Sequence, residues 1–271
     1  MAVQEITSIP LLGYKGENVR VIQSQLTQKG FPLGTIDGVF GSRTKNALIQ
    51  FQLKQAIEAH GMIDLPTLAA LEINFLPKVH ENGYMPLSWE SANAGNKAWS
   101  DYAFKIIEGL FTDFDKCQDI KRIRPDYDSL SKIQKINVWG ELISAIALPE
   151  SAWKPTSWMR EDFTNLDSTT GLPVKSEGLL QLSYQDKKSY PNLPCRFGWD
   201  ADKNLSENDP KKTIFDPYIN LEMGINILAH QIRNQKKVIL TKNVYWAVIK
   251  ENGKYQKITP IITMVNNIKF N

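Results

Sequence analysis

An internal echo near the N-terminus constrains the fold of this chain more than any other feature of its sequence. Residues 37–48 (DGVFGSRTKNAL) align with residues 60–71 (HGMIDLPTLAAL), and glycine, threonine, alanine and leucine recur at matching places. A repeat this short indicates two copies of one turn-and-helix unit that pack together and bury a shared face. In each copy a glycine fits the turn, and Ser42 in the first or Pro66 with Thr67 in the second then begins the helix.

Apolar residues three and four positions apart predict the helices around this repeat. One apolar stripe runs from Val19 to Leu26, and another runs from Ala47 to Phe51. With the second copy of the repeat, these stripes indicate a small three-helix module over residues 10–76.

This module resembles the type 1 peptidoglycan-binding domain, a repeat found on many bacterial and phage wall hydrolases. Asp64 stands where the second copy usually has another glycine. Most matching residues maintain the fold and do not locate a binding pocket. The candidate wall contacts are Asp37, Arg43 and Thr44 of the first copy. The matching positions are Val19, Ile22, Gln23, Leu26, Gly30, 37–41, Thr44, Ala47, Phe51, Gln52, Gly61, Thr67 and Leu71.

The composition is that of a soluble globular protein. Hydrophobic residues make up 42% of the 271 residues and charged ones 23%, which is enough for a packed core. No stretch approaches the roughly 18 apolar residues of a membrane span, and the N-terminus lacks the basic and apolar parts of a secretory signal. The net charge of +3 is spread along the chain, which disfavours nucleic acid as a partner but suits an anionic polymer.

The metal- and thiol-bearing residues are few and scattered. Cys117 and Cys195 are far apart, so we expect two buried thiols, with a single bridge as the alternative. His60, His80 and His230 are also widely spaced, which argues against a zinc site and against a histidine-centred triad. We therefore expect neither a metal nor a cofactor.

The rest of the chain predicts a second, larger domain. Residues 77–97 carry Pro, Gly, Asn and Ser without an apolar period, as a connector does. Helical spacing follows at 98–111 and 131–148, and again at 213–233, where Asp216 and Pro217 provide the cap. Only the segment 168–184 suggests a small sheet. We expect a mainly α protein with a binding domain at 1–76, a connector at 77–97 and a lysozyme-like α domain with a small sheet at 98–271.

Glu150 is the residue most suited to acid chemistry. It follows a wholly apolar stretch at the end of the predicted 131–148 helix, which Pro149 is expected to end, and Leu148 and Trp153 flank it. A partly desolvated carboxyl has a raised pKa and can donate a proton to the leaving oxygen of a glycosidic bond. On position alone, a solvated glutamate at a helix end is the more common case.

Three ordered segments change that balance. ESAWKP at 150–155, SEGLLQL at 176–182 and DPYINLEMG at 216–224 resemble the motifs of soluble lytic transglycosylases and goose-type lysozymes. The resemblance spans residues 136–232. It implies that Glu150 is the catalytic acid, that the GLLQ turn lines the sugar groove, and that the helix carrying Asn220 and Gly224 supports the site.

The sequence departs from these families in two places. A polar insertion at 156–175 contains Glu161, Asp162 and Asp167, and an inverting lysozyme would need a second carboxylate about 6.5 to 9.5 Å from the acid. Asp162 or Asp167 is the candidate for that role, unless these acids only solvate a loop. In these families a tyrosine approaches the catalytic Glu. Tyr245 is the candidate for that tyrosine in this chain, and its surrounding sequence matches only loosely.

Aromatic faces and short polar side chains bind sugars in open clefts, which provides the candidate groove residues. Trp158 suits the core as well as it suits the groove. The candidates are Trp158, Ser176, Gln181, Ser183 and Tyr184.

These observations predict an enzyme that degrades peptidoglycan. We expect a monomer that cleaves the β-1,4 bond between N-acetylmuramic acid and N-acetylglucosamine in the lytic-transglycosylase manner, with Glu150 alone. The alternatives are an inverting lysozyme and a non-catalytic wall-binding protein. The architecture resembles modular phage endolysins, so we expect action on the bacterial wall after release by a holin or another export route.

Overall fold

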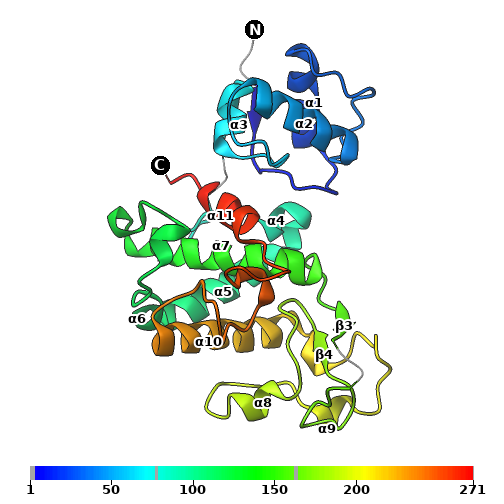
Figure 1. Ribbon diagram of the computed structural model, residues 1–271, viewed down its shortest axis with the longest axis vertical. Coiled ribbons are helices and arrows are strands. Elements are labelled where there is room, and N and C mark those ends of the chain that lie inside the picture. Colours follow the sequence, from blue (N-terminus) through cyan, green and yellow to red (C-terminus); the bar gives the residue numbers. More distant parts are fainter. Residues whose placement is uncertain (1–3, 77–78, 162–163, 271) are drawn as a thin grey trace.

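Two separate hydrophobic clusters organise the chain. The structure is a computed structural model that describes residues 4–76, 79–161 and 164–270. The smaller cluster fills the N-terminal domain, and the larger one fills the helical domain stacked beneath it in Figure 1. The described residues form helices and two short two-stranded sheets, as the sequence predicted for a mainly α fold.

The N-terminal domain contains the two helix units that the repeat predicted. Its helices are α1 (Glu17–Gln28), α2 (Ser42–Lys54) and α3 (Leu65–Ala70). Strand β1 (Gln4–Ile6) pairs in parallel with β2 (Ile73–Phe75) and joins the two ends of the domain. This pairing was not predicted, because three-residue strands leave almost no alternation in the sequence.

A buried glutamine explains why glycine and threonine recur in the repeat. Gln23 accepts from the backbone N–H of Gly38 at 2.8 Å and donates to the Thr44 hydroxyl at 3.1 Å. In the second copy Gln52 does the same, with the backbone N–H of Gly61 at 2.9 Å and the Thr67 hydroxyl at 2.9 Å. The repeat therefore preserves a hydrogen-bond unit that fastens each turn to the preceding helix.

Asp64, which stands where the second copy of the repeat usually has glycine, has a local structural role. Its carboxylate accepts from the backbone N–H of Thr67 at 2.8 Å and so caps the N-terminus of α3.

In the larger domain the long helix α7 (Lys132–Ser151) runs through the centre. Helices α5 (Lys97–Gly109) and α11 (Ile258–Asn266) pack against α7, and α10 (Pro217–Gln235) packs against α5 (Figure 1). Short helices complete the domain: α4 (Trp89–Ala92), α6 (Phe111–Phe114), α8 (Asp186–Ser189) and α9 (Trp199–Asp202). Helix α7 is buried on all sides between positions 136 and 147, where most side chains are apolar and the polar ones are Asn137, Glu141 and Ser144.

The helices predicted at 98–111, 131–148 and 213–233 are all present, within a few residues of the expected bounds. Asp216 caps α10 by accepting from the backbone N–H groups of Tyr218 and Ile219 at 2.8 and 3.0 Å. Cys117 and Cys195 are free thiols, of which Cys117 is buried and Cys195 is half-buried. No helix in the described parts of the chain has the length and hydropathy to span a membrane.

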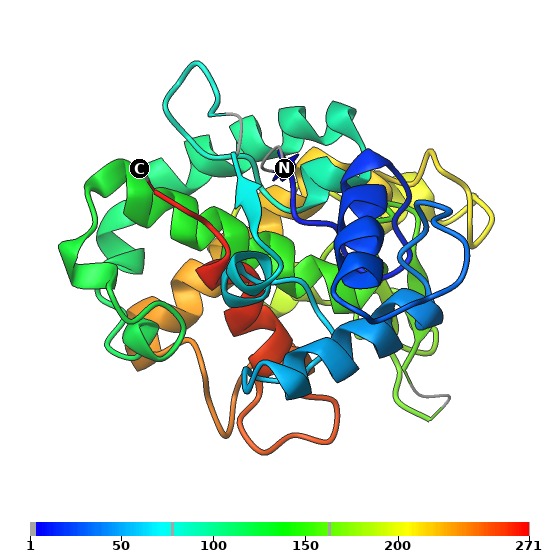
Figure 2. The same cartoon turned by 90° about the horizontal axis from the view of Figure 1, so that it is seen from above.

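The two domains contact each other directly. The Tyr14 ring lies 5.8 Å from that of Trp153, measured between centroids. The Asn267 side chain accepts from the backbone N–H of Leu65 at 3.2 Å and donates to the carbonyl of Ile63 at 3.0 Å. From above, the N-terminal helices lie over one end of α7 and beside α11 (Figure 2).

The connector predicted at 77–97 takes part in this packing. Leu87 and Trp89 are fully buried in the larger cluster, so this stretch packs against the helical domain. Residues 77 and 78 lie outside the described residues.

Candidate active site

Glu150 lies in the last turn of α7. The helix continues through Pro149 to Ser151, and the expectation that Pro149 ends it was wrong. The proline removes one backbone donor, but the backbone N–H of Ala152 still donates to the Leu148 carbonyl at 2.8 Å, so the turn is retained.

The backbone turns sharply directly after Glu150 and Ser151. Ala152 and Trp153 both have left-handed conformations, with φ of 51° and 58°. Such conformations cost free energy for residues other than glycine and are often found at functional sites. Trp153 is buried, and its indole N–H donates to the Ser144 carbonyl at 2.8 Å, which holds the turn in place.

The carboxyl of Glu150 is half-buried and has no hydrogen-bond or ion-pair partner among the described residues. Burial, and secondly the negative charge of Glu161, raise its pKa to about 7. A substantial fraction of Glu150 is therefore protonated near neutral pH and can donate its proton to a bound molecule.

A strained turn follows strand β4 (Lys175–Glu177), which pairs antiparallel with β3 (Trp158–Arg160). Within this turn Gly178 and Gln181 have φ of +83° and 49°. A Cβ on Gly178 would lie 2.1 Å from Nδ2 of Asn220, so only glycine fits there.

Helix α10 supports this turn through buried contacts. Asn220 accepts from the backbone N–H of Leu180 at 2.8 Å and donates to the carbonyls of Glu177 and Ile214 at 3.1 and 3.0 Å. A Cβ on Gly224 would lie 2.3 Å from the Leu180 side chain. The two motifs meet as the resemblance implied, with the helix behind the turn.

The polar side chains predicted for the groove are mostly engaged within the protein. Ser176 donates to the carboxylate of Glu161. The amide of Gln181 donates to the carbonyls of Ser157 and Gly178, at 3.2 and 2.8 Å. Both side chains are buried, and both lie on the strand and turn that follow the insertion.

Ser183 and Tyr184 lie just after this turn and are also buried. Ser183 donates to Asp167 at 2.7 Å, and the Tyr184 hydroxyl donates to Asp202 at 2.7 Å. Tyr184 packs edge-on against Phe197. These contacts give Tyr184 a place in the core, away from the surface that a sugar would reach.

Trp158 is half-buried on β3, and the ammonium of Lys175 lies 5.3 Å from its ring centroid. The cation covers one face of the ring, which is a typical cation–π arrangement. Trp158 therefore contributes to the packing of the small sheet as well as to its surface.

Asp167 has the contacts of a structural carboxylate. It accepts from the backbone N–H groups of Thr169, Thr170 and Gln185 at 2.7, 2.9 and 3.0 Å, in addition to Ser183. A buried carboxylate with four donors has little capacity left to take a proton from water. Asp162, the other predicted candidate, lies outside the described residues.

Tyr245 lies against a second buried acid. Its hydroxyl donates to Asp186, whose pKa is raised to about 6, mainly by burial. The negative charge of Glu161 also acts on both Asp186 and Tyr245. The structure thus brings Tyr245, Asp186, Glu161 and Glu150 into one electrostatic neighbourhood.

Glu161 is the residue that the sequence reasoning did not select. It follows β3 directly, and its backbone N–H donates to the Val174 carbonyl at 3.0 Å, which extends the pairing with the strand before the GLLQ turn. The register of this pairing sets Glu161 opposite Val174, and no periodicity in the polar insertion predicts that register.

The predicted wall contacts also lie together. Asp37, Arg43 and Thr44 line a cavity of about 170 Å³ in the N-terminal domain. The Arg43 guanidinium is 4.0 Å from the Asp37 carboxylate, and both side chains are accessible, whereas Thr44 is buried. A hydrogen bond from Gln23 is the main cause of the lowered pKa of Asp37.

Comparisons with known protein families match both halves of the chain. The family described as a putative peptidoglycan binding domain matches residues 15–71. The family described as a transglycosylase SLT domain matches residues 129–259. The two matches stand in the predicted order.

Solved structures of one protein resemble the chain over two thirds of its length. The structure described as Bd0314 DslA, wild-type form 2, is 26% identical, with a TM-score of 0.54, and covers 67% of this chain and 95% of its own. Two glutamate-to-glutamine mutants of that protein also match. One is 26% identical with a TM-score of 0.53, covering 67% of this chain and 94% of its own, and the other is 24% identical with a TM-score of 0.50 and the same coverage. The two replaced glutamates are eleven residues apart in that protein.

Proposed function

This chain is a modular peptidoglycan-degrading enzyme with a peptidoglycan-binding domain followed by a transglycosylase SLT domain, and from that premise we propose how it cuts its substrate. The bond is the β-1,4 linkage between N-acetylmuramic acid and N-acetylglucosamine, and Glu150 is the catalytic acid. The transglycosylase match favours an enzyme over the alternative of a non-catalytic wall protein.

The proposed reaction requires one carboxyl group. The protonated Glu150 donates its proton to the glycosidic oxygen as the C1–O bond breaks and the muramic sugar gains oxocarbenium character. The resulting carboxylate then accepts the proton of the sugar's own 6-hydroxyl, whose oxygen bonds to C1. The products are a 1,6-anhydro sugar and a free 4-hydroxyl, and Glu150 is protonated again.

One observation carries this proposal: Glu150 is half-buried, lacks a partner among the described residues, and has a pKa raised to about 7. A solvated glutamate at a helix end would be exposed and would keep its ordinary pKa. A ligand oxygen can make the hydrogen bond that the described residues do not supply to Glu150.

The test is the substitution Glu150→Gln, which keeps the size of the side chain but removes the transferable proton. We expect lysis of purified sacculi to fall by about a hundredfold to ten-thousandfold, the usual contribution of a general acid. Binding to sacculi in a pelleting assay should be unchanged, because the N-terminal domain is intact. Glu58→Gln, at an exposed position of that domain, is the matched control. Lysis by the Glu150→Gln variant at the wild-type rate would refute the proposal.

A second candidate reaction is hydrolysis with Glu161 as the second carboxylate. Glu161 belongs to the 156–175 insertion that suggested an inverting lysozyme, and its charge acts directly on Glu150. Glu150 and Glu161 are eleven residues apart, the same interval as the two glutamates replaced in Bd0314 DslA. Both facts favour Glu161, which accepts a hydrogen bond from Ser176, over Asp167, which accepts four, as the group that would activate water.

Mass spectrometry of the released muropeptides separates the two reactions. Anhydro-forming cleavage gives products one water lighter than those of hydrolysis. Anhydro products support the single-carboxyl reaction, and products of full hydrolytic mass support the role of Glu161.

Wall anchoring suits either reaction. Tethering the catalytic domain to an insoluble polymer raises its effective concentration at the bond to be cut. We propose that the enzyme acts as a monomer on the bacterial wall after a holin or another export route releases it. Light scattering would show the oligomeric state, and lysis that depends on a co-expressed holin would support this route.

A further inference from the structure

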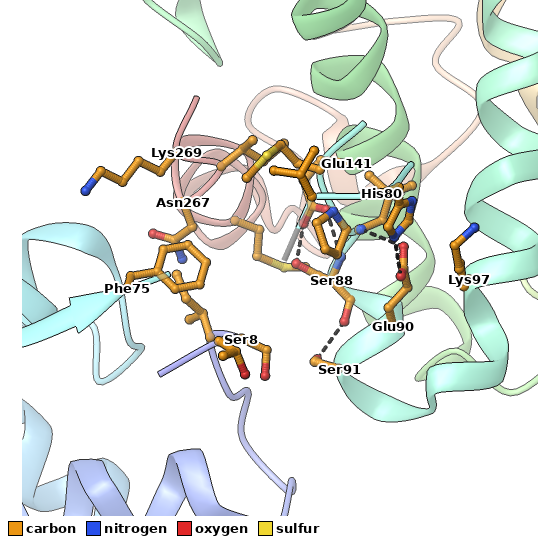
Figure 3. A pocket seen from close by; sticks show the side chains of 18 of the residues that line it. Ser8, Phe75, His80, Ser88, Glu90, Ser91, Lys97, Glu141, Asn267 and Lys269 are labelled. Carbon is orange, nitrogen blue, oxygen red and sulfur yellow. Dashed lines mark hydrogen bonds and ion pairs between the residues drawn. The ribbon is translucent and has the colours of Figure 1, made fainter. Parts of the chain in front are cut away.

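A cavity of about 890 Å³ lies between the two domains, and Glu150 is not among the residues that line it. Its walls come from residues 7–9 and Phe75 of the N-terminal domain, from the 79–97 segment, from Glu141 on α7 and from the end of α11 (Figure 3). This volume is in the usual range for sites that bind small molecules or short peptides.

The wall of the cavity contains a buried acid that the proposed reaction does not use. Glu141 is 1% exposed, and its carboxyl accepts from both the backbone N–H and the hydroxyl of Ser88. Burial raises its pKa to about 8. Two hydrogen bonds from one residue hold this carboxyl in a fixed position at the cavity.

A histidine with an unused nitrogen lies beside it. The His80 side chain is 7% exposed, and its Nε2 lies 2.9 Å from the Glu90 carboxylate. Its Nδ1 is buried without a hydrogen-bond partner, with Asp101 3.9 Å away. Buried polar atoms are rarely left unpaired, so this nitrogen has capacity for a hydrogen bond that the described residues do not supply.

The charges on the cavity are mixed. In Figure 3 Lys269 and Lys97 lie on opposite sides, with Ser88, Glu90 and Glu141 between them. Lys97 is paired with Asp101 at 2.6 Å, whereas Lys269 is exposed and has no ion-pair partner in the described parts of the chain. Apolar side chains such as Phe75 and Met264 complete the walls. The matching ligand has a carboxylate, an ammonium group and small apolar groups.

We propose that this cavity binds the peptide stem of peptidoglycan. A stem peptide has alanine methyl groups, a terminal carboxylate and the side-chain amine of its third residue. In this arrangement Lys269 binds the carboxylate, the exposed Glu81 faces the amine, and Phe75 and Met264 contact the methyl groups. The inference rests on the proposed function only in taking peptidoglycan as the polymer. Binding in this cavity would let the enzyme recognise the peptide part of the polymer as well as its glycan part.

The test is calorimetric titration of the full chain with a synthetic stem pentapeptide that contains lysine and ends in two D-alanines. We expect saturable binding by the wild type and about tenfold weaker binding by Lys269→Glu, which reverses the charge that meets the carboxylate. The matched control is Lys105→Glu, an exposed lysine of α5 outside the cavity, which should bind as the wild type does.

Two outcomes overturn the inference: no binding of the peptide by the wild type, or equal loss in the Lys269→Glu and Lys105→Glu variants. The Glu150→Gln variant separates this inference from the proposed reaction. It should bind the peptide normally even though it no longer cleaves glycan, so failure of one proposal does not imply failure of the other.

Discussion

Three glutamates of the helical domain have pKa values raised by burial, and their partners distinguish them. Glu177 is buried against the ammonium of Lys212, and Glu141 is held by Ser88. Glu150 has no such partner among the described residues and is partly accessible. A carboxyl that is paired internally stabilises the fold, whereas an unpaired, accessible one with a raised pKa is available to a ligand.

The pH profile of cleavage follows from this difference. Glu150 must hold its proton to donate it, so kcat/KM on a soluble glycan oligomer should fall as pH rises through about 7. Replacing Glu161 with Gln removes a negative charge near Glu150, lowers the pKa of Glu150, and should move this alkaline limb to lower pH. The shift should be smaller than the whole rise in pKa, since burial is the larger cause.

The quantity compared is the pH at which kcat/KM declines, and not the absolute rate. A second role of Glu161 that changes the rate therefore does not affect the comparison. The exposed Glu58→Gln variant should keep the wild-type profile. A limb that stays in place in the Glu161→Gln variant, or wild-type activity that does not decline above neutral pH, would contradict the assignment of Glu150.

At the scale of the elements, the sequence predicted the long helices and the meeting of the turn with α10. Asp216 and Pro217 signal the start of α10, and Asn220 is the only motif amide on its inner face that reaches the GLLQ turn in the described structure. Glu161 could not be selected in this way, because the register of β3 on β4 depends on a polar insertion without periodicity. The hydrogen bonds of Asp167 could not be predicted from the sequence either. Their donors lie on both sides of the GLLQ turn, as Thr169 and Ser183 do.

Substitution of Asn220 measures how strongly the helix holds the turn. Asn220→Ala leaves one buried N–H and two buried carbonyls without their partner, and should lower the free energy of unfolding by about 3 kcal/mol or more. Asn226→Ala on the same helix removes one part-buried bond to the Glu222 carbonyl, and should cost about 1 kcal/mol or less. Denaturant titrations of the two variants provide the comparison. Equal losses would mean that Asn220 does not hold the turn.

For the whole molecule, the contacts between the domains bear on how wall binding could orient the catalytic domain. Tyr14 of the binding domain packs on Trp153, three residues after Glu150, and Asn267, directly after α11, bonds to the backbone on both sides of Asp64. A flexible tether would give the catalytic domain proximity to the wall but no fixed direction. These contacts add orientation, so we expect a glycan strand held by the N-terminal domain to reach Glu150 from one side.

The double variant Tyr14→Ala with Asn267→Ala tests whether these contacts fix the orientation. It removes the ring contact and both interdomain hydrogen bonds of Asn267, while the chain between the domains remains. In NMR relaxation the wild-type domains should share one rotational correlation time, and in the variant the N-terminal domain should tumble faster than the helical domain. The matched control pairs the exposed Tyr255→Ala with Asn266→Ala, whose side chain bonds to Ile123 and Ile262 within the helical domain. Its domains should still tumble together, because none of the removed contacts crosses the boundary. If the Tyr14 and Asn267 variant also keeps a single correlation time, apolar packing such as that of Leu11 in the larger cluster holds the domains without these residues.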